Sequence, residues 1–279
     1  MNVLITGANG YIGQHVVSKV CDLGHNVIAC DIRFTNKDSR AKYVEYDIFS
    51  NNLSGIYKHF ESPDVCLHMA WRDGFVHNSN NHILDLSSHF RFLQTLVDEG
   101  VKHIAIMGSM HEVGYWEGAI DYNTPCYPTS LYGIAKDTLR RTMFSYCQNK
   151  DVVLQWLRAY YIIGDDTRNN SVFSKLLKAE SEGKDTFPFT SGKTKYDFIT
   201  VNELSYQIAQ TILQKKITGI INCCSGKPVT LAEQVENFIA DNKLKIRLEY
   251  GAYPDRPYDS PITYGNPEKI REILRACDN

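Results

Sequence analysis

Several features that define whole classes of protein are missing from this chain. No stretch of the 279 residues approaches the run of about eighteen apolar residues that a membrane-spanning helix requires. Lysine and arginine number 30 against 32 acidic residues, which gives a net charge of −2 without a basic tract or an acidic tail. A surface that binds nucleic acid or an anionic membrane needs a basic excess. We therefore expect no nucleic-acid or membrane partner, and a small molecule as ligand.

The cysteines and histidines form no recognisable motif either. The eight cysteines are scattered without a CxxC pair, and the adjacent Cys223 and Cys224 would point to opposite faces of a strand. The nine histidines show neither HExxH nor a Cys/His ligand spacing, so no metal site is predicted. No charged leader precedes the first apolar segment. These observations predict reduced thiols and a cytoplasmic protein.

Glycines are present where they carry information, in the stretch ITGANGYIG. Gly7, Gly10 and Gly13 directly follow a predicted strand over 2–6 and open a run with helical spacing of apolar residues. A second apolar strand follows and ends at Asp31. In a dinucleotide-binding βαβ unit, such glycines allow a tight turn and close approach of a pyrophosphate, and the later acid binds the ribose hydroxyls. The order of these parts predicts a dinucleotide site rather than a simple turn.

Strands and helices alternate through the first part of the chain. This alternation with near-continuous apolar strands predicts an α/β fold: a Rossmann-type doubly wound parallel sheet covered on both faces. The predicted strands lie at 2–6, 27–30, 43–46, 65–69, 104–107 and 152–159, with helices at 83–99 and 130–149.

After about residue 165 the elements become shorter and more widely spaced. We predict a dinucleotide-binding domain over 1–164 and a smaller C-terminal substrate-binding lobe over 165–279, with some later segments returning to the first sheet. The segment Ser191–Thr194, SGKT, lacks the upstream glycine of a P-loop and is interpreted as the tip of a hairpin.

A candidate acid–base group lies in the segment PTSLYGIAK. Tyr132 and Lys136 are one helical turn apart, so both side chains lie on one face of the predicted helix. An ammonium beside a phenol would lower the pKa of the phenol from its usual value near 10. The same spacing also fits a half-buried tyrosine beside a solvated lysine. The position of Ser109, after a strand of the predicted sheet, favours a catalytic group because its hydroxyl could bind the reacting oxygen.

Taken together, these segments resemble the extended short-chain dehydrogenases/reductases, in the NAD-dependent epimerase/dehydratase branch that acts on nucleotide sugars. The similarity covers nearly the whole chain: TGANGYIG, Asp31, Asp47-Ile48, LHMA at 67–70, YDFITVNEL at 196–204 and GIINCCSGKPVTLAE at 219–233. The resemblance implies Ser109, Tyr132 and Lys136 as the catalytic residues. The implied cofactor-binding residues are Gly7, Gly10, Tyr11, Ile12, Gly13, Asp31, Ile32, Arg33, Asp47, Ile48, Met69, Ala70, Tyr132 and Lys136.

Departures from the family pattern narrow the expected reaction. Met110 and His111 occupy the positions where 4,6-dehydratases of the family carry an Asp-Glu pair, which disfavours a dehydratase. His111 could serve as a second acid or base, or be a structural histidine. Tyr161 replaces the asparagine of an RxxN element, and Arg256 resembles an arginine that pairs with the nucleotide diphosphate, although a surface salt bridge would also explain it. The substrate-binding candidates are Trp71, His111, Tyr161 and Arg256.

The ending of the chain resembles nucleotide-sugar 4-ketoreductases, such as those that make dTDP-6-deoxyhexoses. The resemblance implies an NAD(P)H-dependent reductase of a 4-keto-6-deoxy nucleotide sugar. An NAD-dependent 4-epimerase is the alternative, and a non-catalytic dinucleotide sensor a third. Asp31 favours NAD(H) because it would repel a 2′-phosphate, whereas Arg33 could compensate for that charge and leaves NADP(H) open.

The oligomeric state is also an expectation from the resemblance. Members of the family often form homodimers through two helices that correspond to 83–99 and 130–149. The apolar residues Phe90, Phe92, Leu93 and Leu96 fit such an interface, and they fit an intramolecular core equally well.

Overall fold

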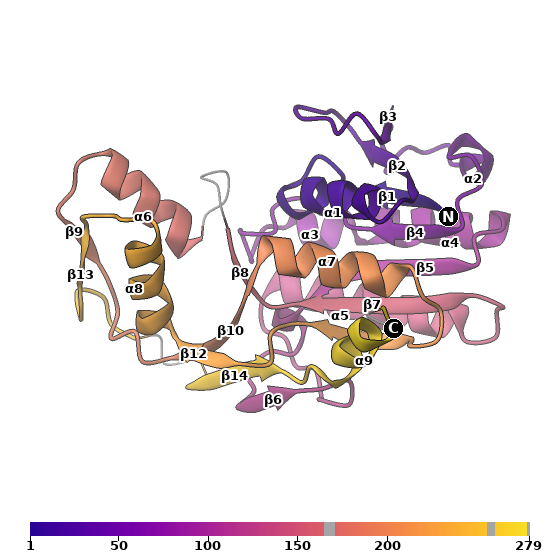
Figure 1. Cartoon of the computed structure of the whole chain (residues 1–279). Coiled ribbons are helices and arrows are strands. Elements are labelled where there is room, and N and C mark those ends of the chain that lie inside the picture. The colour runs from indigo at the N-terminus through magenta and orange to yellow at the C-terminus, as the bar shows by residue number, and fades with distance from the viewer. Residues whose placement is uncertain (165–170, 256–259, 278–279) are drawn as a thin grey trace.

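The computed structural model describes residues 1–164, 171–255 and 260–277. Its main element is a parallel seven-stranded sheet in the order β11-β7-β5-β4-β1-β2-β3 (Figure 1). The strands are β1 (Asn2–Thr6), β2 (Asn26–Asp31), β3 (Lys42–Glu45), β4 (Val65–His68), β5 (His103–Ser109), β7 (Val153–Ala159) and β11 (Gly219–Cys223).

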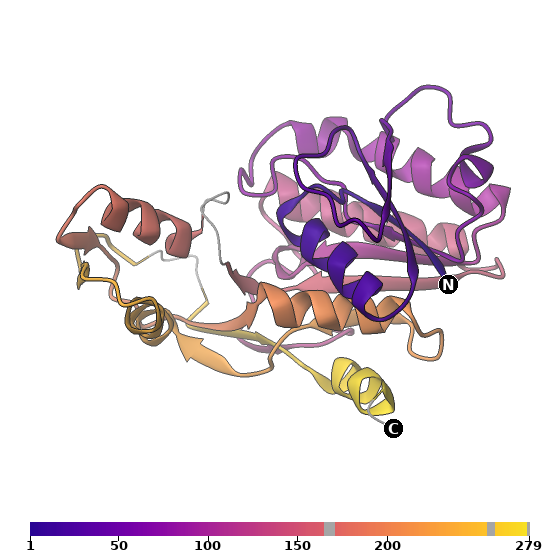
Figure 2. The ribbon, with the colours of Figure 1, turned by 45° about the horizontal axis from the view of Figure 1, so that its top comes forward.

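The central strands are buried on both faces because helices cover the sheet on each side. Every residue of β5 is buried, as are Val3, Leu4 and Ile5 of β1. Helices α1 (Tyr11–Asp22) and α7 (Val201–Ile212) pack together on one face, where they share one apolar cluster (Figures 1 and 2). The other face is covered by α4 (Leu86–Glu99) and α5 (Leu131–Cys147), with the short α2 (Ile56–His59) and α3 (Asn81–Leu84) beside them. The predicted doubly wound sheet is thus confirmed.

The apolar residues of α4 belong to this core. Phe92, Leu93 and Leu96 have no exposed surface and pack against the sheet, whereas Phe90 is half-buried at the edge of the same cluster. The sequence fits these residues to a dimer interface or to an intramolecular core, and the structure places Phe92, Leu93 and Leu96 in the core. A homodimer stays a prediction, and its interface would have to use other side chains of α4 and α5.

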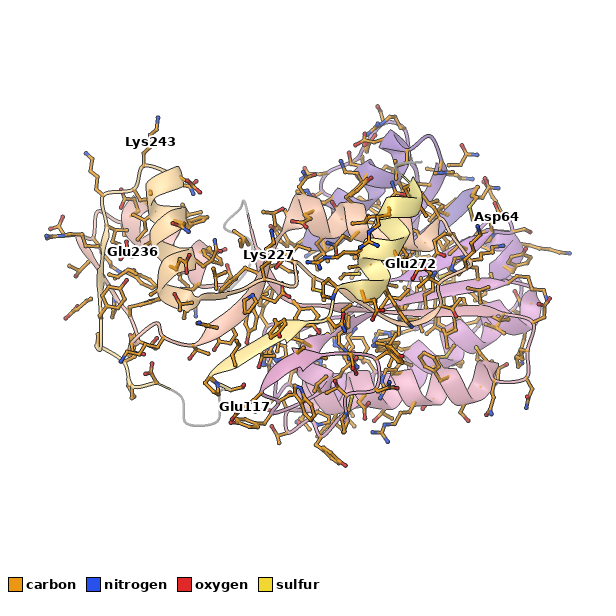
Figure 3. The ribbon with its side chains drawn as sticks, turned by 60° about the horizontal axis from the view of Figure 1, so that its bottom comes forward. Asp64, Glu117, Lys227, Glu236, Lys243 and Glu272 are labelled. Atoms are coloured by element: carbon orange, nitrogen blue, oxygen red, sulfur yellow. The ribbon has the colours of Figure 1, made fainter. Side chains whose placement is uncertain are left out.

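The smaller lobe is built around a second sheet. Strands β12 (Pro228–Thr230), β10 (Lys195–Thr200), β14 (Ile262–Gly265) and β6 (Gly118–Ile120) lie in that order, and β8 (Tyr161–Ile163) also pairs with β10. Beyond them lie α6 (Val172–Ser181), α8 (Leu231–Asp241) and the two-stranded pair of β9 (Thr186–Pro188) and β13 (Arg247–Glu249). An apolar cluster that includes Phe173, Phe198 and Phe238 holds this lobe together. Figure 3 shows Glu236 of α8 and Lys243 on the side of the lobe away from the main sheet.

Later segments return to the main sheet, as predicted. Strand β11 pairs with β7, α7 packs against α1, and the C-terminal helix α9 (Glu268–Cys277) packs against α7 and β11 (Figures 1 and 3). In the reverse direction, β6 and β8 precede residue 164 and pair with strands of the smaller lobe. The division of the chain into domains at residue 164 stays a prediction.

Two local predictions are wrong. The helix expected over 83–99 is interrupted at Asp85, which separates α3 from α4. The segment Ser191–Thr194 is not a hairpin tip, because the flanking strands do not pair with each other: β9 pairs with β13, and β10 pairs with β8, β12 and β14. The backbone N–H of Ser191 instead donates to Asp255 at 3.1 Å.

The cysteines are all free thiols, and seven of the eight are buried. Cys223 and Cys224 lie in different apolar clusters on opposite sides of the end of β11, as the strand geometry predicts. Among the helices of the described residues, none has both the length and the apolar character that crossing a bilayer would require.

The strand order places the candidate site. Going along the sheet, the chain order reverses between β1 and β4, and in open parallel sheets ligands bind outside the carboxyl ends of the strands at such a point. The glycine turn follows β1 and the segment Met69-Ala70 follows β4, so both lie at this crevice.

Candidate active site

The glycine turn is packed directly against the end of β4. Gly7 has a φ of +71°, and a Cβ there would lie 2.6 Å from the backbone nitrogen of Ala70. A Cβ on Gly13 would lie 2.2 Å from the carbonyl oxygen of Gly7. Any larger residue at either position would have to displace main chain. These two glycines therefore bring α1 and the end of β4 into close contact with the turn.

The N-terminus of α1 is suited to bind an anion. Its N-cap is Gly10 in an extended conformation, no side chain caps the helix, and its first turn holds no acidic residue. Main-chain N–H groups and the helix dipole therefore define the electrostatics of this end. Tyr11 and Ile12, both half-buried, follow in the first turn. The residues fit the pyrophosphate of a dinucleotide.

Asp31 is bonded to the glycine turn. It is the last residue of β2, and its Oδ2 accepts the backbone N–H of Asn9 at 2.9 Å while Oδ1 accepts that of Ile32 at 2.8 Å. The side chain of Asn9 in turn accepts the N–H of Thr35 at 3.0 Å. The acid predicted to bind ribose thus lies beside the predicted pyrophosphate site, and the exposed Ile32 and Arg33 follow it.

The remaining predicted cofactor residues follow β3 and β4. Asp47 is exposed and Ile48 is buried. Met69 and Ala70 are half-buried, and the backbone N–H of each donates to Oγ1 of Thr6 at 3.3 Å. All of these residues lie in segments that leave the carboxyl end of a sheet strand. Their contacts with a cofactor stay a prediction.

Ser109, Tyr132 and Lys136 come together at the end of β5. Ser109 is the last residue of β5, and its hydroxyl lies near enough to the phenol of Tyr132 to lower the pKa of that phenol against the larger effect of burial. Lys136 has an exposed fraction of 3%, and its Nζ donates to the carbonyl oxygen of Met107 at 2.7 Å. Nζ lies 5.9 Å from the centre of the Tyr132 ring. Ser130 caps α5 by accepting the N–H of Gly133, which fixes the start of the helix that carries both side chains.

Burial governs the protonation of this group. It raises the pKa of Tyr132 to about 12, against a smaller lowering effect of the Ser109 hydroxyl. It lowers the pKa of Lys136 to about 7, against the charge of Glu112. The expectation that Lys136 lowers the pKa of Tyr132 is therefore wrong for this structure, because the cost of burying a phenolate exceeds any gain from the amine. The phenol is protonated at neutral pH.

Aromatic rings surround Tyr132. The ring of His77 lies 5.5 Å away and nearly parallel, at 11°, and those of His82 and Trp71 lie at 5.2 and 6.1 Å. Neither His77 nor His82 is predicted from the sequence. The backbone also contributes, since the N–H of Tyr132 donates to the carbonyl of His77 at 2.8 Å. These two histidines lie in the segment that joins β4 to α4, where no periodic pattern marks them.

Three of the four predicted substrate-binding residues lie at this site. The ring of His111 is 6.2 Å from that of Tyr132 and 6.1 Å from that of Tyr161, and Trp71 also contacts Tyr132. Burial lowers the pKa of His111 to about 4, so its imidazole is neutral at pH 7. The fourth residue, Arg256, lies outside the described residues.

The loop after β5 offers no second acid in the dehydratase position. Met110 is buried in an apolar cluster. Glu112, the carboxylate of the same short 3₁₀ helix η1 (Met110–Glu112), is fully buried and paired with Arg158. In the described ranges, no three His, Cys, Asp or Glu side chains are grouped so as to hold a metal ion.

The fold and the site together define a class of protein. A parallel sheet with a glycine turn suited to bind an anion, an acid at the end of its second strand and a Ser–Tyr–Lys group at the end of β5 is the arrangement of a dinucleotide-dependent oxidoreductase. Residues 3–224 match the model of the NAD dependent epimerase/dehydratase family. The chain belongs to this family, as its sequence motifs predict, and it is an NAD-dependent enzyme.

Individual relatives cover almost the whole chain. A dTDP-6-deoxy-L-talose 4-dehydrogenase (NAD(+)) from Aggregatibacter actinomycetemcomitans is 45% identical over 271 residues, which span 95% of this chain and 99% of the relative. Among solved structures, a UDP-glucose-4-epimerase from Stenotrophomonas maltophila with bound NAD and formylated UDP-arabinopyranose has a TM-score of 0.85 at 16% identity, covering 98% of this chain and 92% of its own. A UDP-glucose 4-epimerase from Thermus thermophilus in complex with NAD has a TM-score of 0.80 at 18% identity, with coverage of 98% and 92%. At these low identities the two structures establish the fold alone.

Proposed function

We propose that the protein is an NAD(H)-dependent oxidoreductase that acts at C4 of a dTDP-linked 6-deoxyhexose, with reduction of the 4-keto sugar as its reaction. The observation that carries this proposal is the 45% identity, over nearly the full length of both chains, with a dTDP-6-deoxy-L-talose 4-dehydrogenase (NAD(+)). A 4-dehydrogenase and a 4-ketoreductase catalyse one reaction in opposite directions, so the two descriptions require the same active site.

The cofactor would occupy the crevice between the ends of β1 and β4. Gly7, Gly10 and Gly13 would hold its pyrophosphate and Asp31 its adenosine ribose, for which the close packing of the turn and the uncapped α1 provide the support. The bound nicotinamide supplies or accepts the hydride. NAD(H) is favoured over NADP(H) because Asp31 would repel a 2′-phosphate.

Tyr132 would act as the proton donor in the reducing direction. The buried phenol is protonated at neutral pH, since its pKa is raised to about 12, and a proton donor must carry its proton when substrate binds. Ser109, whose hydroxyl acts on the pKa of that phenol, would hold the reacting oxygen in line with it. The ammonium form of Lys136 would place a positive charge on the side of the oxygen that loses the proton. The pKa of Lys136 is about 7, so this form is present at neutral pH.

The substrate would lie between this group and the smaller lobe. His111 and Tyr161 lead from Tyr132 towards that lobe, and Arg256 is the candidate for the diphosphate. We also infer a homodimer through the outer faces of α4 and α5. Sedimentation equilibrium would test the dimer, with a single species of monomer mass as the contradicting result.

Activity with purified protein tests the proposed reaction directly. Incubation with the 4-keto form of dTDP-6-deoxy-L-talose and NADH should oxidise one NADH for each sugar reduced, with the new hydroxyl at C4 identified by NMR. Tyr132→Phe should abolish this turnover while retaining bound NADH. Isomerisation of a 4-hydroxy nucleotide sugar without net change in nicotinamide would instead establish the epimerase. Turnover that is unchanged in Tyr132→Phe would exclude the catalytic role of the phenol.

A further inference from the structure

An aromatic ring lies over the ammonium of Lys136. Nζ is 3.7 Å from the centre of the Trp71 indole, closer than its distance of 5.9 Å to the centre of the Tyr132 ring. Lys136 is almost fully buried, and its Nζ donates to the carbonyl oxygen of Met107. An ammonium over an indole face is attracted by the negative face of the ring, most strongly when water is excluded. The indole and this carbonyl thus supply much of the polar environment of the charge.

The indole is itself held by two histidines. Its Nε1–H donates to Nδ1 of His82 at 3.0 Å, and the ring stacks on that of His89 at 4.4 Å and 9°. Because Nδ1 of His82 accepts this bond, its Nε2 carries the hydrogen and donates to the carbonyl of Val76 at 3.0 Å. His82 therefore has a single tautomer that fits both partners. The indole is thus hydrogen-bonded to His82 along one edge and stacked on the ring of His89, which has a hydrogen-bond partner of its own.

His89 is linked by hydrogen bonds to the residue that precedes the glycine turn. Nδ1 of His89 is 2.9 Å from Nε2 of His68, and Nδ1 of His68 is 2.8 Å from Oγ1 of Thr6, the residue before Gly7. Burial lowers the pKa of His68 to about 3 and that of His89 well below its usual value, so both rings are neutral. A neutral ring stacked on the indole does not compete with Lys136 for the aromatic face.

We propose that Trp71 is a positioning residue of the active site, whose indole face, fixed by His82, holds and stabilises the ammonium of Lys136 beside Tyr132. This role rests on the proposed function for its catalytic meaning, but the contact itself is a property of the protein alone. The sequence predicts Trp71 as a substrate-binding residue, whereas the structure places its ring on the lysine.

The charge on Lys136 is sensitive to such a contact. Its pKa lies at about 7, so a modest change in stabilisation of the ammonium alters its charge at physiological pH. The other ionisable groups around it are Tyr132, His68, His89 and Glu112. The two histidines are neutral, the phenol is protonated, and the Glu112 carboxylate raises the pKa of Lys136. The indole adds to the effect of Glu112.

A fluorination series tests the contact without changing the size of the side chain. Indoles with increasing numbers of ring fluorines are introduced at position 71, and the pKa of Lys136 is measured by NMR of ¹³C-labelled lysine without cofactor or substrate, with Lys136→Arg to assign the signal. Each fluorine weakens the negative face of the ring, so the pKa of Lys136 should fall stepwise, by about half a unit or more across the series. The same substitutions at Trp116, whose indole donates to the carbonyl of Ala119, should leave it unchanged. A pKa of Lys136 that does not change as fluorines are added at position 71 would overturn the proposal.

His82 variants test the anchoring of the indole. His82→Phe keeps a ring but removes the acceptor, so the pKa of Lys136 should fall, and the pH profile of kcat should shift with it while KM for the nucleotide sugar changes little. His82→Gln supplies a new acceptor and should restore both. If the pKa of Lys136 and the pH profile of kcat in His82→Phe equal those of the native protein, His82 does not anchor the indole. Since the NMR measurement needs no substrate, failure of the proposed reaction and failure of the Trp71 contact are separate results.

Discussion

Arg158 and Glu112 form an ion pair that no solvent reaches. Nε of Arg158 donates to Oε1 of Glu112 at 2.6 Å, and both side chains have an exposed fraction of 0%. Nε1 of Trp156 also donates to the carboxylate, at 2.8 Å to one oxygen. Glu112 ends the short helix that begins directly after Ser109. The pair therefore anchors the short helix that follows Ser109 to strand β7.

Removing one member of this pair should strongly destabilise the protein. Arg158→Met leaves a buried carboxylate with only the Trp156 bond, and breaking a buried pair in this way costs about 3–5 kcal/mol. Unfolding in urea would measure the loss, and turnover should fall as Ser109 loses its support. As a control, Asp151→Asn removes the exposed partner of Lys102 and should leave the midpoint unchanged. A midpoint for Arg158→Met equal to that of the native protein would contradict the anchoring role.

Two glycines allow the cost of a close contact at the glycine turn to be separated from the cost of a left-handed backbone. Gly7 and Gly24 have similar positive φ values, +71° and +79°, but a Cβ on Gly24 would meet nothing within 4 Å. Gly24→Ala should therefore show only the cost of the left-handed backbone, about 1 kcal/mol. Gly7→Ala should cost more in urea unfolding and should weaken NADH binding, measured by fluorescence titration. Equal losses of stability in the two variants would show that contact with the end of β4 is unimportant.

The parts of the fold that the sequence predicts are those with strong local signals. The apolar strands, the glycine turn and the acid at position 31 are all contained in short segments, and the structure has them in the predicted order. Strands β6, β8 and β14 are three or four residues long and exist because of partners distant in the sequence, such as Gly118 with Thr263. Nothing in their own residues distinguishes them from loop.

In the predicted site, too, the sequence identifies residues with a local signal and misses contacts between distant segments. Tyr132, Lys136 and Ser109 can be found because helix spacing and the end of a strand place them, and the structure brings them together. The sequence also predicts Trp71 at the site, but the contact of its ring with Lys136 depends on His82 of α3 and His89 of α4. The direction of the Tyr132 pKa shift depends on burial, which the spacing of two residues does not reveal.

Buried histidines should make the protein sensitive to acid. Burial lowers the pKa of His68 to about 3, and of His103 and His111 to about 4. Well above pH 6.5 these rings are neutral in the folded and unfolded states. As the pH falls below 6.5 the unfolded chain binds protons that the folded protein does not, so stability should fall until the pH reaches about 3, most steeply above pH 4.

His103 offers a way to measure one of these contributions. It begins β5, at the opposite end of the strand from Ser109, and its Nε2 donates to Gln155 at 2.8 Å. His103→Gln keeps a donor for Gln155 but removes the titrating group. Between pH 6.5 and 4 the slope of unfolding free energy against pH should become shallower by up to about 1.4 kcal/mol per pH unit, with activity at pH 7 retained. A slope identical to that of the native protein would contradict the effect of burial on His103.

Asp31 should determine the choice between NADH and NADPH. Its carboxylate lies beside the glycine turn, where it would repel a 2′-phosphate, and Asp31→Asn removes the charge while keeping an oxygen that can accept the N–H of Asn9. The ratio of the Kd for NADPH to that for NADH, measured by fluorescence titration, should fall about tenfold or more, which corresponds to ~1.4 kcal/mol. Asp151→Asn, at an exposed position before β7, serves as the control and should leave the ratio unchanged. In the Asp31→Asn background, Arg33→Ala should weaken NADPH binding selectively, since the guanidinium would then be the group that faces the phosphate. Equal affinity of the native protein for the two cofactors would show that Asp31 does not discriminate between them.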